Sequence, residues 1–518
     1  MFRLASLVAL LSMSLVLAAC GSSGGAADAD PATAVPRDAL FYLEATVRPE
    51  GQQREDALAA AGKVLQTPDP EAKLREWLDS SSEDFDYERD LAPWLGERGA
   101  LWVSSRTVEG DDRPGLAAVI AATDLEEAEG AIEEAQAREQ SKATERSHAG
   151  VDYKVDEDGF AYAFEGDFVL VGDEPELKQT IDALEGESLA DEDRYKKPVD
   201  ALDGDRLAHV WMDTRRLFEL GMKADPEAAQ QFEQLKGIFD FEKLPPAAAA
   251  FVADGSRLAI DGSIEIPEGN QQQPFGSLMG VGSTALLEEL PGDSWAAQGA
   301  PKFGETMKLM FGQAAGAFGG GIAQEQLRSQ LGIDLERDVF SWVGDVAVFV
   351  RGETLDSVDG GAVIQVTDEA AAADAFGRLV GAARSRGQVD ARPVDIEGAE
   401  TAFAAALPEA PKPIVMARSA DKVVITYGQE AATAALSGSD TLGDSELYGR
   451  TRDVLGDGLD PSFLIAVGPI VSLVDSSGSA DASWNEFKPY LEAFDLLAVG
   501  GGTDGDTARF RIAAGLRD

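Results

Sequence analysis

Cysteine and histidine are nearly absent from this sequence of 518 residues, which contains one cysteine, Cys20, and two histidines, His148 and His209. A single cysteine cannot form a disulfide within the chain. Zinc sites are built mainly from cysteine and histidine, so one could form here only if carboxylates supplied most of the ligands. We therefore expect no metal site and no cofactor. Chemistry with a cysteine nucleophile is excluded if Cys20 carries a lipid.

Basic residues are also scarce, because 44 Lys and Arg stand against 93 Asp and Glu, a formal net charge of −49. Such a surface repels phosphate backbones and anionic lipid headgroups, which excludes nucleic acid as a partner and disfavours electrostatic docking on a membrane. The simplest role of the excess charge is solubility. Calcium, basic peptides or a high-salt setting are alternatives, although acidic clusters such as 156–158 lack the spacing of an EF-hand loop.

An apolar run without any charge extends from Leu4 to Ala19, directly after Arg3. It is shorter than the roughly 20 apolar residues that a membrane-spanning helix needs. Its length and its position after a basic residue are typical of a secretory signal peptide. The overall contents of 44% hydrophobic and 26% charged residues indicate a soluble globular protein.

The apolar run ends in Leu17-Ala18-Ala19-Cys20 and is followed by Gly21-Ser22-Ser23-Gly24-Gly25. This segment resembles the lipobox of bacterial lipoproteins, in which cleavage occurs before a cysteine that carries a diacylglyceryl group. Two acyl chains, at about 0.8 kcal/mol per buried methylene, anchor a protein stably. We expect a signal peptide at 1–19, a lipid on Cys20 that holds the protein at the extracytoplasmic side of the cell membrane, and a flexible tether over 20–34. The alternative is an ordinary secretory signal with an incidental cysteine.

One segment of the chain occurs twice. Asp-Tyr-Glu-Arg-Asp-Leu-Ala-Pro-Trp-Leu-Gly at 86–96 returns as Asp-Leu-Glu-Arg-Asp-Val-Phe-Ser-Trp-Val-Gly at 334–344, with six of eleven positions identical. We expect a short helix with an aspartate at its N-cap, a tryptophan that anchors it on a sheet, and a glycine that ends it. The alternative is that the charged residues line a pair of sites. The residues concerned are Asp86, Arg89, Trp94, Gly96, Asp334, Arg337, Trp342 and Gly344.

Further segments follow the same repeat. Val35-Pro36-Arg37-Asp38 matches Leu290-Pro291-Gly292-Asp293. Residues 118–124 match 362–368, and both of these segments are an apolar strand pattern followed by Thr-Asp. Consecutive strand patterns separated by turns favour an antiparallel sheet, and the helical patterns between them favour the α+β class. We predict two homologous α+β halves, 35–267 and 285–518, joined by a linker over 268–284.

The lipobox, the opening Val35-Pro36-Arg37-Asp38-Ala39-Leu40-Phe41-Tyr42 and the repeated Asp-x-Glu-Arg-Asp-x-x-x-Trp-x-Gly segment together resemble the bacterial family catalogued as domain of unknown function 3352. The resemblance covers most of the mature chain. It implies neither an activity nor any functional residue, because the family is uncharacterised.

One segment departs from the repeat. Residues 303–331 are rich in Phe, Met, Ala and Gly, whereas their counterpart in the first half is polar. At helical spacing the large apolar residues would form one face. This face is either buried between the halves or forms an apolar surface for a lipid, a peptide or another hydrophobic ligand. The candidate residues are Phe303, Met307, Met310, Phe311 and Phe318.

The sequence contains no convincing catalytic constellation. Residues 500–505 fit the glycine pattern of dinucleotide-binding proteins, but a strand rather than a helix follows them, so a hairpin turn is favoured. We therefore expect a lipid-anchored envelope protein that binds or scaffolds and is not an enzyme, with a possible apolar ligand or a protein partner in the envelope. One alternative is a carrier that holds an apolar ligand between its halves. Another is a hydrolase that uses carboxylates alone.

Overall fold

The computed structural model of the protein describes residues 28–79, 86–107, 113–139, 142–157, 159–202, 204–224, 243–266, 282–314, 334–385, 391–407, 410–478 and 481–517. The chain forms two compact units. Unit 1 comprises Met1–Ala224, Lys243–Pro267 and Asp518, and unit 2 comprises Asp225–Glu242 and Glu268–Arg517. The segment predicted to be a signal peptide, 1–19, and Cys20 lie outside the described residues. Within those residues, no helix is long and apolar enough to cross a membrane.

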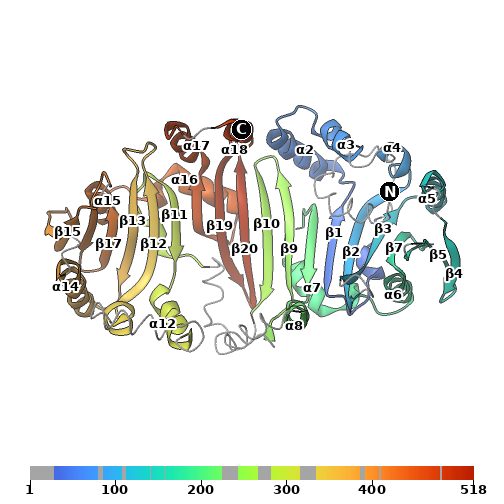
Figure 1. The fold of residues 1–518 in the computed structure, drawn as a ribbon, viewed down its shortest axis with the longest axis horizontal. Helices are drawn as coiled ribbons and strands as arrows, with labels where there is room; N and C mark the ends of the chain where they lie inside the picture. Colours follow the sequence, from blue (N-terminus) through green and yellow to red (C-terminus); the bar gives the residue numbers. More distant parts are fainter. Residues whose placement is uncertain are drawn as a thin grey trace. The chain divides into compact units, whose positions relative to one another are not determined.

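Unit 1 is built on an antiparallel sheet (Figure 1). Its described strands are β1 (Phe41–Thr46), β2 (Leu95–Thr107), β3 (Pro114–Ala122), β4 (Thr144–His148), β5 (Val151–Val155), β6 (Phe160–Glu165), β7 (Phe168–Asp173), β8 (Ala208–Met212), β9 (Ala247–Asp254) and β10 (Arg257–Glu265). They pair in the order β10-β9-β8-β1-β2-β3-β7-β6-β5-β4, and every pair is antiparallel.

The helices of unit 1 lie between these strands in the sequence. They are η2 (Pro31–Ala34), α2 (Gly51–Leu65), α3 (Pro70–Asp79), α4 (Tyr87–Asp90), α5 (Leu125–Glu139), α6 (Glu174–Glu185), η3 (Leu189–Asp191), α7 (Asp193–Asp200) and α8 (Thr214–Ala224). One apolar core contains Trp102 and Trp211 with Leu177 of α6, and a second contains Trp94 with Ile132 of α5. Residues of the one sheet thus belong to two cores, and each core includes a different helix.

The structure corrects the predicted extent of the tether. Pro31–Ala34 forms a 3-10 helix whose first turn is capped by the Asp30 side chain, which accepts a hydrogen bond from the Ala32 N–H at 3.1 Å. Ala32 and Ala34 have no exposed surface and belong to the core that contains Trp102. The globular part therefore begins before residue 35, and a tether through residue 34 is wrong for this segment.

Unit 2 has the same strand order. Its described strands are β11 (Ser294–Ala300), β12 (Val343–Arg351), β13 (Asp359–Val366), β14 (Ala391–Pro393), β15 (Thr401–Ala405), β16 (Ile414–Arg418), β17 (Lys422–Tyr427), β18 (Asp460–Ala466), β19 (Phe494–Asp504) and β20 (Thr507–Leu516). They pair as β20-β19-β18-β11-β12-β13-β17-β16-β15-β14, all antiparallel. The predicted α+β class with a mainly antiparallel sheet is confirmed.

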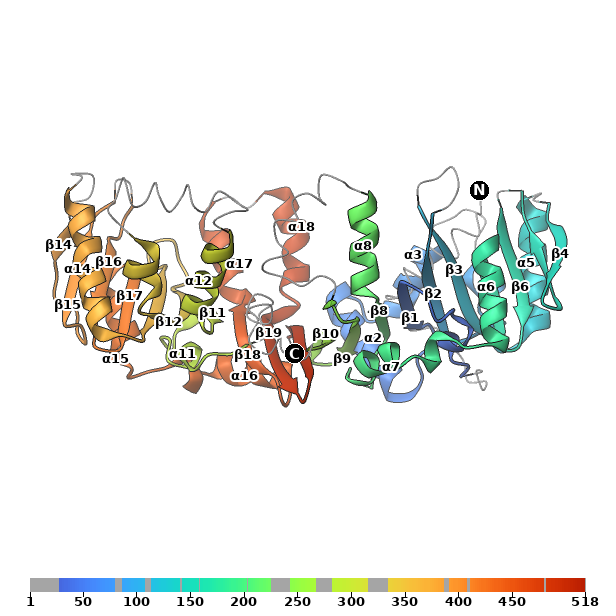
Figure 2. The same ribbon diagram turned by 90° about the horizontal axis from the view of Figure 1, so that it is seen from below.

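The helices of unit 2 are α11 (Ala285–Glu288), α12 (Phe303–Ala314), η5 (Glu336–Phe340), α14 (Glu369–Ser385), α15 (Gln429–Ser437), η6 (Leu442–Asp444), α16 (Glu446–Leu455), α17 (Val467–Ser476) and α18 (Ala482–Leu491). Within this unit, α11 and α16 lie on one side of the sheet and α12 and α17 on the other (Figure 2). The main core joins Phe349 and Leu464 to Leu287 of α11 and Tyr448 of α16. A smaller cluster joins Trp342 to α14.

Candidate functional site

The repeated segment forms a hydrogen-bonded anchor in unit 1. Asp86 caps α4, because its carboxylate accepts from the Arg89 N–H at 2.9 Å. The Asp90 carboxylate accepts from the Asp86 N–H at 3.0 Å and from Nε and Nη2 of Arg89 at 2.8 and 2.7 Å. Arg138 of α5 adds a contact of 2.7 Å to the same carboxylate. Trp94 is fully buried, and its indole N–H donates to the Asp90 carbonyl at 2.8 Å.

Unit 2 builds the same arrangement. Asp334 accepts from the Arg337 N–H at 3.2 Å, and Asp338 accepts from the Asp334 N–H at 2.8 Å. Nε and Nη2 of Arg337 donate to the Asp338 carboxylate at 2.7 and 2.8 Å, and Arg378 of α14 approaches it at 2.8 Å. Trp342 donates to the Asp338 carbonyl at 2.9 Å. The local helix differs, since Glu336–Phe340 is a π-helix.

Arginine contacts hold these carboxylates ionised. Burial raises the pKa of Asp90, but hydrogen bonds from Arg89, the Asp86 N–H and Arg138 outweigh it, and the pKa is lowered. The hydrogen bond from Arg337 lowers the pKa of Asp338 to about 2, against the effect of burial. Both carboxylates are occupied by protein donors. The anchor is therefore suited to packing a short helix on the sheet rather than to binding a ligand.

The glycines of the repeated segment do not end a helix, which corrects the prediction. Gly96 lies in β2 and Gly344 in β12. A Cβ on Gly96 would lie 2.6 Å from the carbonyl oxygen of Ala121, and one on Gly344 would lie 2.9 Å from Gln365 Oε1 and Thr367 Cγ2. Gly96 needs glycine because the backbone of the neighbouring strand approaches closely, whereas the atoms nearest to Gly344 are the ends of side chains.

A buried polar cluster in unit 1 was not predicted from the sequence. Arg98 donates to Glu44 at 2.8 Å, and Tyr42 donates to the same carboxylate. Next to them, the Tyr195 hydroxyl lies 3.1 Å from Nε2 of His209. Burial raises the pKa of Tyr195, and burial together with nearby guanidinium groups lowers the pKa of His209 to about 3. These side chains have partners within the protein, so the cluster is closed and structural.

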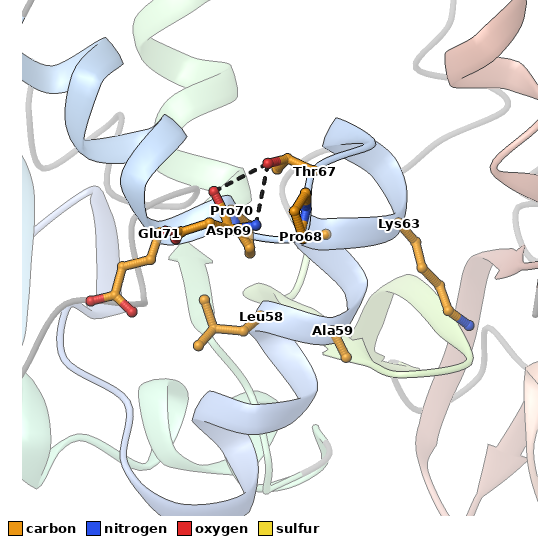
Figure 3. Close-up of a pocket in the computed structure, with 9 residues that line it drawn as sticks. Leu58, Ala59, Lys63, Thr67, Pro68, Asp69, Pro70 and Glu71 are labelled. Atoms are coloured by element: carbon orange, nitrogen blue, oxygen red, sulfur yellow. Dashed lines mark hydrogen bonds between the residues drawn. The ribbon is translucent and has the colours of Figure 1, made fainter.

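Two surface pockets also occur in unit 1. One of about 580 Å³ lies between α2 and α3, where Thr67 Oγ1 bonds both the amide and the carbonyl of Asp69 (Figure 3). Its one basic side chain, Lys63, donates to the Gly255 carbonyl at 3.0 Å. The other pocket, of about 640 Å³, lies beside α5 and contains Lys154, which is paired with Glu133 at 2.6 Å, and Arg146, which is paired with Glu174 at 2.5 Å. In both pockets the basic side chains are already bound to protein oxygen atoms.

The most distinctive surface is one face of the unit 2 sheet. Cross-strand partners point to the same face, and the registers align two rows of side chains across seven strands, from β17 through β13, β12, β11, β18 and β19 to β20. The first row is Ile425, Ala362, Val348, Gln298, Phe463, Val499 and Ile512, and the second is Tyr427, Gly360, Val350, Ala296, Ile465, Leu497 and Ala514. We call these two rows the apolar face.

Four side chains of the apolar face are substantially exposed: Ile512 at 48%, Leu497 at 43%, Val348 at 41% and Ile425 at 39%. The rows contain no charged residue, and their polar groups are those of Gln298 and Tyr427. On β17, β13, β12, β11 and β18, strand neighbours on the opposite face belong to the main core of the unit, namely Val424, Val363, Ala347, Phe349, Ala297 and Leu464. Helix α12 contacts β12 and α17 contacts β19. These helices lie at opposite ends of the strands (Figure 1). The described helices do not cover the four exposed side chains.

The candidate apolar face predicted on 303–331 is described only in part. Phe303, the first residue of α12, packs against the cluster that contains Trp342, and Met307 is half-buried. The side chains of Met310 and Phe311 lie outside the described residues, as does Phe318. Phe303 thus packs against other apolar side chains of unit 2. The prediction of an apolar ligand face on the other residues is not tested. Within the described chain, no group of His, Cys, Asp and Glu side chains could hold a metal ion.

The sequence carried a signal for the apolar face. Residues 346–350 read Val-Ala-Val-Phe-Val, and 496–499 read Leu-Leu-Ala-Val, without a polar side chain. Antiparallel strands with one solvated face normally alternate apolar and polar residues. The missing alternation indicates that both faces of these strands are apolar. It does not indicate that one of the faces lacks a covering helix.

No curated protein matches the sequence. Two crystal forms of TP0453, forms I and III, are similar to 49% of this chain and to 85% and 86% of theirs, with identities of 10% and 11% and TM-scores of 0.26 and 0.25. These low scores support no inference about function. The family described as "Protein of unknown function (DUF3352)" matches residues 4–451, which confirms the predicted family resemblance, and the chain therefore belongs to this family.

Proposed function

We propose that the protein is a lipid-anchored envelope protein on the extracytoplasmic side of the cell membrane, which binds a hydrophobic ligand and catalyses no reaction. The observation that carries this proposal is the apolar face of unit 2. Monomeric soluble proteins rarely leave a contiguous apolar surface open, and such surfaces mark binding sites. The lipobox-like segment at Cys20 supports the anchor.

We also propose that the two halves are homologous. The common strand order and the repeated arrangement of Asp, Arg and Trp support this view. The functional difference between the halves then arises from what has been added to a common scaffold. The ligand site proposed here lies on unit 2 alone, rather than between the halves.

The second candidate function is a scaffold, in which another envelope protein covers the apolar face. Native mass spectrometry of the protein extracted from membranes distinguishes the two. A bound lipid or other small hydrophobic molecule is expected for the carrier, whereas a bound protein would favour the scaffold. Extraction of a protein with neither would contradict both proposals.

The anchor is tested separately by Cys20→Ala, which removes the thiol that the lipid would modify. We expect the variant to leave the membrane fraction and to appear in the soluble fraction at unchanged total amount. Continued sedimentation with membranes in high salt would show that the protein is held there in another way.

A further inference from the structure

We infer that the ligand of the apolar face is a single acyl chain of a membrane phospholipid with an uncharged or zwitterionic head, lying across the strands of unit 2. This inference rests on the proposed function and names the ligand and its direction. The two rows run perpendicular to the strands. An acyl chain that follows a row therefore crosses the sheet from strand to strand and meets no charged side chain.

The dimensions suit a hydrocarbon chain. The rows cross seven strands, and with a spacing of about 4.8 Å between neighbouring strands the six intervals extend over about 29 Å. One leaflet of a bilayer has a hydrocarbon thickness of about 15 Å, half of the full core. One acyl chain therefore fits within the rows and covers about half of their length, so that its whole length is in contact with apolar side chains.

The chemistry of the face excludes a peptide strand as its occupant. Strands β11, β12 and β18 each pair with a neighbour on both sides, so their backbone groups are used within the sheet and cannot accept an added strand. The side chains offer mainly apolar surface, and Gln298 is the one amide among them. A ligand that needs no hydrogen bonds over most of its length gains most from this surface.

Charge argues against a second copy of the chain and against an anionic lipid. Each copy has a formal net charge of −49, so two copies repel each other. The same repulsion acts on an anionic headgroup. A zwitterionic or uncharged lipid head experiences no such net repulsion. The acyl chain of the lipid carries no charge and is not repelled either.

The test uses lysophosphatidylcholines of increasing chain length, below their micelle-forming concentrations, and the mature chain carrying Cys20→Ala so that no lipid of its own competes. Binding is measured by calorimetry. We expect the affinity to rise about threefold to fourfold with each added methylene, the effect of burying one such group. A lysophospholipid with an anionic head and the same chain is expected to bind more weakly. Equal affinities for all chain lengths, or tighter binding of the anionic lipid, would overturn the inference.

The location is tested by Val348→Thr combined with Ile512→Thr. Threonine keeps the branched shape that strands favour, and both positions are exposed, so the fold is retained. The pair should weaken binding about fourfold or more, because a chain of this length lies against one of the two positions, where a methyl group (Val348) or an ethyl group (Ile512) is replaced by a hydroxyl. Ile260→Thr is the matched control, since Ile260 is a strand residue of unit 1 with 46% exposure. Unchanged binding in the double variant would place the ligand elsewhere and overturn the inference, while the broader proposal that the protein binds a hydrophobic ligand would stand. Absence of binding in the parent chain would contradict the proposed function as well.

Discussion

The buried polar cluster of unit 1 predicts a specific sensitivity to acid, in which His209 has the largest part. His209 is 2% exposed, and its ring lies against the Tyr195 hydroxyl. Burial, and then the guanidinium groups of Arg206 and Arg98, lower its pKa to about 3, and Asp30 opposes them. Around this cluster Glu44 is bound to Arg98. In the unfolded chain the pKa of a histidine is about 6.5.

The sign of the effect follows from these two values. Between pH 6.5 and pH 3 the unfolded chain binds a proton at His209, whereas the folded protein keeps the ring neutral. The contribution of His209 to the free energy of unfolding is therefore fully present above pH 6.5 and is lost as the pH falls towards 3. Each pH unit in this window removes about 1.4 kcal/mol, so acidification from pH 7.5 to pH 4.5 removes about 2.7 kcal/mol.

Urea unfolding of the parent protein and of His209→Gln at pH 7.5 and pH 4.5 measures this term. Glutamine stays neutral and can still hydrogen-bond with Tyr195, while the carboxylates titrate alike in both proteins. Tryptophan fluorescence follows the cluster, because the rings of Tyr195 and Trp211 lie 6.0 Å apart. The parent should lose about 2.7 kcal/mol more than the variant. His148→Gln is the control, since His148 is partly exposed and bound to Asp182. Equal losses in the parent and in His209→Gln would refute the reasoning.

Two further predictions concern the repeated anchor. Trp94→Ala and Trp342→Ala should each lower the free energy of unfolding by about 3–5 kcal/mol in urea titrations, as other large-to-small core substitutions do, and near-zero effects would contradict a packing role. Asp338→Asn removes a carboxylate whose pKa is about 2. Its ionised form stabilises the protein fully above about pH 4, so the variant should be about 2 kcal/mol less stable at pH 6 and about half of that at pH 3. A difference that does not change with pH would show that ionisation of Asp338 is unimportant.

The fold class could be predicted because it depends on local patterns. Apolar strands followed by Thr-Asp at 118–124 and 362–368 indicated strand and helix in the right order, and the turns between strands indicated antiparallel pairing. The glycines of the repeated segment were misjudged for a physical reason. A glycine after a helix often ends it, but Gly96 is required by the close approach of Ala121, which belongs to a different strand. A local sequence pattern does not reveal a contact between residues of two separate strands.

The buried cluster and the apolar face could not be predicted for a related reason. Tyr42, Arg98, Tyr195 and His209 come from separate elements, and only the pairing of β1 with β8 brings Glu44 opposite His209. In the same way, Ile425 and Ile512 belong to one row only because six strand registers agree. Register is a property of the assembled sheet. The sequence showed strands without alternation but not which residues lie side by side.

The two units have the same strand order but bury different side chains at matching positions. This difference is relevant to how a ligand site arises in one unit alone. Glu44 lies eight residues after Pro36, and Gly299 lies eight residues after Pro291, at the matching place in β11. A side chain at Gly299 would meet Thr284 Cγ2 at 2.7 Å, so unit 2 fills this space with its own N-terminal segment and has no carboxylate there. The acid-sensitive cluster is therefore specific to unit 1. Because His209 belongs to unit 1 and the apolar face belongs to unit 2, a ligand on that face should bind without a contribution from the pH dependence of His209.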